Sequence, residues 1–188
     1  MSVPIESQPT PGEREATTPA IQTRGIPRRV VEGNQECDGP VKNFMKPGIH
    51  FTKVWFDDDM IELKIDVSDG ISSFSNRVYV GYPAFAGVLA QLEVFKHHIH
   101  GGLLDIRFGE FGPEYAHGAF HARLHFQKPG RLYISSKQQS EFGEFSVGKV
   151  ASEATLYLKT EPGLLDNFID ELSGLNAKRR QDAHLEAI

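Results

Sequence analysis

The sequence predicts an α+β fold in which an antiparallel β-sheet carries two amphipathic helices on one face, in the order βββ-α-ββββ-α. Two kinds of pattern carry this prediction. Several short segments alternate apolar and polar residues with a period of two, which is typical of strands with one buried and one solvated face. Two other segments repeat apolar residues every three or four positions, which is typical of helices that bury one stripe.

The composition divides the chain into an arm, a domain and a tail. Residues 1–48 are rich in Pro, Thr, Ser, Gln and Glu, as in ESQPTPGEREATTPA. They contain no apolar period from which a core face could form, so we expect a flexible arm. Residues 49–175 contain all the predicted elements and form the α+β domain. Residues 176–188 are expected to fray as a polar C-terminal tail.

The domain begins with three predicted strands, FTKVWF, MIELKIDVS and ISSFSNRVYV. In the middle strand, every second residue from Ile61 to Val67 is apolar and the residues between them are charged. Asp69-Gly70 predicts a two-residue hairpin turn, because both residues tolerate positive φ angles. The run Asp57, Asp58 and Asp59 lacks the ligand spacing of a calcium-binding loop and is interpreted as a solvated turn.

A helix is predicted within PAFAGVLAQLEVFKHHIHGG, with Pro83 in its first turn and Gly101 as its stop. Its apolar stripe consists of Phe85, Val88, Leu89, Leu92 and Phe95. The histidines His97, His98 and His100 would then lie in the last turn, where donors interact favourably with the unpaired carbonyls.

Four more strands and a second helix complete the domain. The strands are predicted in LLDIRF, HGAFHARLHF, RLYIS and VASEATLYLKT. The helix follows Thr160 and carries a stripe of Leu164, Leu165, Phe168, Ile169, Leu172 and Leu175. We expect Phe85, Leu89 and Leu92 of the first helix and Leu165, Phe168 and Leu172 of the second to pack against Leu63, Ile65, Phe120 and Leu124.

The segment HGAFHARLHF places His117, His121 and His125 at every fourth position. On a helix they would lie along one side, but the even positions are apolar or small from Gly118 to Phe126, which indicates a strand. Successive histidines on a strand are about 13 Å apart, so no two of them can share one metal ion unaided. We interpret these side chains and Arg123 as the outer face of a sheet and as a recognition surface.

Charge and composition favour a protein partner over a nucleic acid or a membrane. Residues 51–175 contain 11 Lys and Arg against 17 Asp and Glu, a net charge of −6. Such a balance disfavours a phosphate backbone and suits a basic protein. The single cysteine, Cys37, excludes an intramolecular disulfide. No signal peptide or apolar run of membrane-spanning length is present, so we expect a cytoplasmic protein.

The common catalytic signatures are absent from the sequence, and no cofactor is expected. Glu110 and Glu114, in GEFGPEYAH, are a carboxylate pair near histidines from which a general acid or base could be built, but they are interpreted as loop residues. A metal-binding enzyme that uses the His97–His100 or His117–His125 clusters stays an alternative.

The metal alternative has one specific set of ligands, His98, His100 and Asp105. Their order is similar to the first metal motif of cupins. The similarity fails where Leu92 stands in place of that motif's glycine, and no second histidine motif follows.

The layout resembles that of small immunity-type proteins found beside bacterial polymorphic toxins, including the group named after WapI immunity proteins. MIELKIDV, FAGVLAQLEVF, LLDIRFGEFGPEY, LYLKT and PGLLDNFIDELSGL carry this resemblance, which covers roughly residues 51–175. It implies a non-catalytic binding protein that neutralises one cognate toxin. These families share no catalytic residues that could be carried over.

We therefore expect a protein-binding domain, with a basic toxin as its predicted partner. The candidate contact residues are the acidic Asp57, Asp58, Asp59, Glu110 and Glu114, which would steer the encounter, together with His121 and Arg123. A further alternative is an adaptor that binds through its arm, around Arg24 to Arg29.

Overall fold

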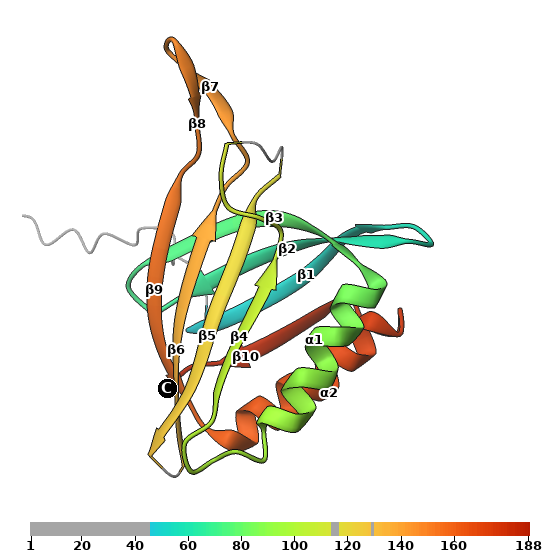
Figure 1. Ribbon diagram of the computed structural model, residues 1–188, viewed down its shortest axis with the longest axis vertical. Helices are drawn as coiled ribbons and strands as arrows, with labels where there is room; N and C mark the ends of the chain where they lie inside the picture. Colours follow the sequence, from blue (N-terminus) through green and yellow to red (C-terminus); the bar gives the residue numbers. More distant parts are fainter. Residues whose placement is uncertain (1–45, 114–116, 129) are drawn as a thin grey trace, which may run out of the picture. The chain divides into compact units, whose positions relative to one another are not determined.

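The computed structural model describes residues 46–113, 117–128 and 130–188, which form an α+β domain with antiparallel strands and two helices, as predicted (Figure 1). In chain order the elements are β1 (Gly48–Phe56), β2 (Met60–Ser68), β3 (Ser73–Gly81), α1 (Tyr82–Phe95), β4 (Leu103–Phe108), β5 (Ala119–Lys128), β6 (Arg131–Gln139), β7 (Gly143–Phe145), β8 (Gly148–Val150), β9 (Glu153–Thr160), α2 (Pro162–Asn176) and β10 (Asp182–Glu186). The predicted arm lies, up to residue 45, outside the described residues.

The strands form two four-stranded antiparallel sheets where a single sheet is predicted. Sheet A has the order β10-β1-β2-β3, sheet B has the order β4-β5-β6-β9, and β7 pairs with β8 in a separate hairpin. Figure 1 shows the strands of sheet A running across those of sheet B. The alternation of apolar residues identifies the buried face of each strand, but it carries no information on which strands share a sheet. The α+β class with antiparallel strands is therefore confirmed, whereas the number of sheets differs from the prediction.

The two helices lie side by side and pack against each other, α2 beside β10 of sheet A and α1 beside both β3 of sheet A and β4 of sheet B (Figure 1). Phe95 of α1 stacks on Phe126 of β5, with ring centroids 5.0 Å apart. Phe168 of α2 stacks on Phe51 of β1 at 5.7 Å. Neither helix of the described part is long and apolar enough to cross a membrane.

The predicted core positions are buried, with one exception. Leu63, Ile65, Phe85, Leu92, Phe120, Leu124, Leu165, Phe168 and Leu172 are all at most 1% exposed, whereas Leu89 is only half-buried at the edge of the core. Because Phe120 is buried and His121 is partly exposed, the predicted register of the histidine strand is correct.

Two buried amides join the sheets at one corner of the core. Asn76 of β3 donates through Nδ2 to the carbonyl oxygens of Ala119 and Gln139, at 2.9 and 3.0 Å. Gln138 of β6 donates through Nε2 to the side chain of Asn76 at 2.6 Å and to the carbonyl of Ile65 at 3.1 Å. These bonds connect polar groups of sheet A to polar groups of sheet B where both are inaccessible to water.

The predicted polar tail is wrong over its second half. Asp182–Glu186 form β10, which pairs with β1 and buries Ala183 and Leu185 in the core. Only two apolar residues alternate in this short segment, which is too weak a pattern to distinguish a strand from a polar tail.

Two predicted boundaries also differ from the structure. Helix α1 ends at Phe95, where its apolar stripe ends, so His97, His98 and His100 lie beyond its last turn. The β2–β3 connection spans residues 69–72, because Asp69 Oδ1 accepts hydrogen bonds from the amides of Ile71 and Ser72 and holds a four-residue loop.

Candidate functional site

The outer face of sheet B contains the histidines and the arginine singled out in the sequence. β5 is an inner strand of this sheet, and the even residues from Phe120 to Phe126 point into the core. His121, Arg123 and His125 therefore point outward, beside Arg107, Asp105 and Leu103 of β4 in the strand register. His117 precedes the strand and packs on Tyr79 of β3 instead, with ring centroids 4.5 Å apart.

Asp105 holds Arg123 and His121 in place on this face. Arg123 donates to it through Nε at 2.8 Å and through a terminal nitrogen at 3.0 Å, in a two-bond arrangement. His121 Nε2 lies 2.8 Å from the same carboxylate. The Arg123 hydrogen bonds, assisted by His121, hold the pKa of Asp105 at about 2, so this carboxylate stays ionised at neutral pH.

The geometry of this cluster fits binding better than proton transfer. His121 faces the carboxylate with Nε2, the ring nitrogen that reaches farthest from the backbone and that a general base would need for its substrate. Arg123 uses two of its five N–H groups on Asp105, and the other three make no hydrogen bond to the part of the chain that the structure describes. The guanidinium is also fixed in one orientation before any partner arrives, which reduces the entropy lost on binding.

Beside Arg123 the face contains a hollow of about 370 Å³. Its lining includes Arg123, His125, Tyr133, Ser135, Tyr157 and Lys159. Ser135 is a small residue that lies opposite Arg123 on one side and Tyr157 on the other in the strand register. The longer side chains around it leave a depression in the sheet, and Tyr157 stands 73% exposed at its rim.

This face is cationic although the domain as a whole is acidic. The outward positions of its strands include Arg107, Arg123, Lys137 and Lys159, against two carboxylates, Asp105 and Glu153. Both carboxylates are already paired, with Arg123 and with Lys137 respectively. The face therefore offers positive charge to a partner.

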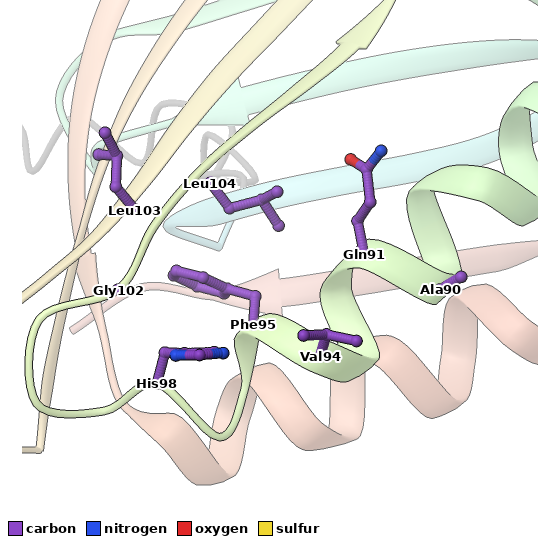
Figure 2. Close-up of a pocket in the computed structure, with 8 residues that line it drawn as sticks. All are labelled: Ala90, Gln91, Val94, Phe95, His98, Gly102, Leu103 and Leu104. Atoms are coloured by element: carbon purple, nitrogen blue, oxygen red, sulfur yellow. The ribbon is translucent and has the colours of Figure 1, made fainter.

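A second hollow, of about 460 Å³, lies along the other side of β4 (Figure 2). Figure 2 shows it between Leu103 and Leu104 of β4 and the end of α1, which contributes Ala90, Gln91, Val94 and Phe95; His98 and Gly102 complete the lining. Val94 and Leu103 are 64% and 56% exposed, so this groove presents apolar surface to solvent.

The acidic candidates do not join this face. Asp57, Asp58 and Asp59 lie in the exposed turn between β1 and β2, as predicted, where Asp57 Oδ1 accepts from the amides of Asp59 and Met60. These bonds, the one from Met60 first, lower the pKa of Asp57. Glu110 is exposed in the loop after β4, and Glu114 lies outside the described residues.

The proposed metal ligands are also separated. His98 lines the apolar groove beside α1, whereas Asp105 points to the outer face of sheet B and is bound by Arg123 and His121. Within the ranges the structure describes, no group of three or more His, Cys, Asp or Glu side chains is arranged to hold a metal ion.

The strand β10 brings together two histidines that the sequence analysis did not connect. His184 lies directly opposite His50 of β1, with ring centroids 5.5 Å apart. Burial, and then the positive charge of a protonated His50, lower the pKa of His184; Lys46 lowers it further, and Glu186 and Glu171 oppose the shift. No sequence signal links these residues, because the segment of His184 is predicted as a tail.

We expect the domain to lose stability as the pH falls below about 6.5, the usual pKa of an unfolded histidine. The folded-state pKa of His184 is lower, so the unfolded chain binds more protons between the two values and stability falls with pH in that window. Urea denaturation from pH 7.5 to 5.0 measures this loss. His184→Gln should reduce the slope, and an unchanged slope in the variant would contradict the assignment.

The sequence alone did not identify the residues that complete the face. Tyr133 and Tyr157 lie in predicted strands and alternate with buried Leu132, Ile134, Leu156 and Leu158, so the same alternation that identified His121 also places them outward. Only the strand register shows that they surround Ser135.

Comparisons with protein-family models, with curated proteins and with solved structures found no match for this chain.

Proposed function

We propose that this chain is a non-catalytic protein-binding domain and that the outer face of sheet B is its contact surface. One observation carries the proposal: Arg123, fixed by Asp105, stands with Tyr133 and Tyr157 around a hollow whose floor is Ser135. Arginine and tyrosine are the side chains that most often dominate binding energy at protein interfaces, especially around pockets. A fixed guanidinium beside the half-buried Tyr133 and the exposed Tyr157 is consistent with such an interface.

The cluster geometry supports the absence of catalysis from this face. His121 directs its outer nitrogen to Asp105, and Asp105 is held ionised by Arg123. Neither group is therefore placed to exchange a proton with a molecule bound in the hollow.

Within this class we propose the immunity role that the layout of the sequence implies, with a bacterial toxin as partner. The net charge of −6 over residues 51–175 favours a basic toxin at long range, whereas the contact face is cationic. A basic toxin that carries an acidic contact patch satisfies both conditions. If a toxin encoded by the neighbouring gene kills cells equally with and without this chain, the immunity role is wrong and the broader binding role stands.

The binding role is tested with a photo-crosslinking amino acid at Tyr157, in cells that naturally express the chain. We expect one adduct of defined mass, lost when Arg123→Glu is added, because the charge reversal removes the fixed guanidinium. The same amino acid at Ile71, which is 95% exposed on the hairpin of sheet A, is the matched control and should give no such adduct.

Two outcomes contradict the proposal. If Tyr157 gives no adduct, or gives the same adduct as Ile71, the outer face of sheet B is not the contact surface. If the adduct forms but disappears when residues 1–45 are deleted, the arm is the binding element and the chain is an adaptor.

A further inference from the structure

We infer that the partner binds as an extended segment that adds a strand to the free edge of β4, and that apolar and acidic side chains alternate along this segment. The inference rests on the proposed protein-binding function and specifies the partner's chemistry. Among the strands of residues 46–113, 117–128 and 130–188, β4 stands at the edge of sheet B and pairs only with β5, with the apolar groove on one side and the cationic face on the other. Extended peptides commonly bind by adding a strand to such an edge.

The hydrogen-bond pattern shows which main-chain groups of β4 are available. The amide of Phe126 donates to the carbonyl of Gly102, which makes residues 102 and 126 a hydrogen-bonded pair. Hydrogen-bonded pairs alternate along an antiparallel ladder, so Leu104, Ile106 and Phe108 also bond to β5. The amides and carbonyls of Leu103, Asp105 and Arg107 therefore point away from β5, toward the free edge, where an added strand can pair with them.

The groove would take every second side chain of the added strand. Neighbouring strands lie about 4.8 Å apart, so a strand paired with Leu103 would lie between β4 and the end of α1. Its inward side chains would meet Val94, Phe95 and Leu104, an apolar lining that now faces solvent at Val94 (Figure 2). Apolar side chains at these positions remove that surface from water, which supplies the main favourable contribution to the free energy of binding.

The outward side chains of the added strand would meet positive charge. They would stand beside Leu103, Asp105 and Arg107, with Arg123 one strand further in. Asp105 is already paired with Arg123 and hydrogen-bonded to His121, and Arg107 is exposed and forms no ion pair with the residues that the structure describes. Carboxylates opposite Arg107, and within reach of Arg123 on the next strand, would therefore be favoured, and basic side chains at the same positions would be repelled.

Synthetic peptides test this chemistry directly. The probe is a heptapeptide with the sequence Glu-Val-Glu-Leu-Glu-Val-Glu, and its controls are the same peptide with Lys in place of Glu and a single-stranded oligonucleotide. We expect the acidic peptide alone to bind, and to slow hydrogen exchange at the amides of Leu103, Asp105 and Arg107 in NMR spectra. Val94→Glu should weaken it at least tenfold, whereas Val147→Glu, an exposed change on the β7–β8 hairpin, should not.

Leu103 allows the main-chain pairing to be separated from the side-chain contact. Leu103→Pro removes one free amide that does not bond to β5, at the first residue of an edge strand where proline is tolerated. Leu103→Ala removes the side chain and keeps the amide. We expect peptide affinity to be about tenfold lower in the proline variant than in the alanine variant. The crosslinking yield from Tyr157 should differ between the two variants by the same factor, while their circular dichroism spectra stay the same.

Each alternative outcome overturns the inference in a recognisable way. If the proline and alanine variants crosslink equally while Arg123→Glu still abolishes the adduct, the partner contacts the face without strand pairing, and the binding function stands. If the lysine peptide binds as well as the glutamate peptide, the alternation of acidic residues is wrong. If the oligonucleotide binds in place of the peptide, the face binds nucleic acid, and both the inference and the proposed function are wrong.

Discussion

Replacing Phe51 with alanine is expected to lower the free energy of unfolding by about 3–5 kcal/mol. Phe51 is fully buried in β1 and touches both sheets and a helix. Its ring packs edge-on against Phe108 and Phe120 of sheet B, with centroids 5.9 and 5.6 Å away, and stacks on Phe168 of α2. A cavity there removes contacts from three elements that cannot all move inward together.

Urea denaturation monitored by circular dichroism measures the Phe51 effect. Phe145→Ala is the matched control, because the same truncation at a 70% exposed position on the β7–β8 hairpin should change stability by less than about 0.5 kcal/mol. Equal effects for the two variants would show that the ring of Phe51 does not hold the sheets and α2 together.

Replacing Asn76 with alanine is expected to cost about 3 kcal/mol, although the change removes only a small polar group. Three partners each lose one hydrogen bond: the carbonyls of Ala119 and Gln139 and the amide nitrogen of Gln138, which keeps its bond to the carbonyl of Ile65. Water has little access to this corner, because Gly118 is so close to the carbonyls of Arg77 and Gln139 that a Cβ on it would lie 2.6 Å from each. Water therefore cannot replace the hydrogen bonds that these buried groups lose.

The same denaturation experiment tests Asn76, with Ser75→Ala as the neighbouring control on the exposed side of β3. A double variant, Asn76→Ala with Gln138→Ala, should cost clearly less than the sum of the two single changes, because the side chains share one hydrogen bond. Additive effects would contradict a shared network.

The local elements of this fold are predictable from the sequence, and their assembly is not. The alternation in β2 and β5 correctly indicates strands and their buried faces, since Ile61, Leu63, Phe120 and Leu124 are all in the core. The alternation does not determine pairing, so the sequence predicts one sheet where two cross. The side-chain amide of Asn76 points inward and interrupts the apolar face of β3. Its burial is understood only from its hydrogen bond with Gln138 on the other sheet, which the sequence does not reveal.

The outward side chains of the candidate face are predictable from the sequence, but their neighbours on other strands are not, because the sequence does not determine strand pairing. His121 and Arg123 were identified because they lie outward on a strand with a clear period. The sequence suggests their anchor, Asp105, only as an alternative metal ligand, because its position opposite Arg123 depends on the β4–β5 register. The acidic turn of Asp57 to Asp59 lies on sheet A, so charge alone could not indicate which surface is cationic.

From the position of β10 we also expect a particular order in which this domain acquires its structure. β1 pairs on one side with β2, to which a short turn connects it. On its other side β1 pairs with β10, which begins at Asp182, far along the chain. Contacts between such distant segments form late, because closing a long loop costs conformational entropy before the strand pairing supplies any favourable free energy. Until then β1 is an open edge that another chain can occupy, either in an aggregate or by exchanging its own C-terminal strand. The step that completes sheet A is thus also the step at which folding is most vulnerable to protein concentration.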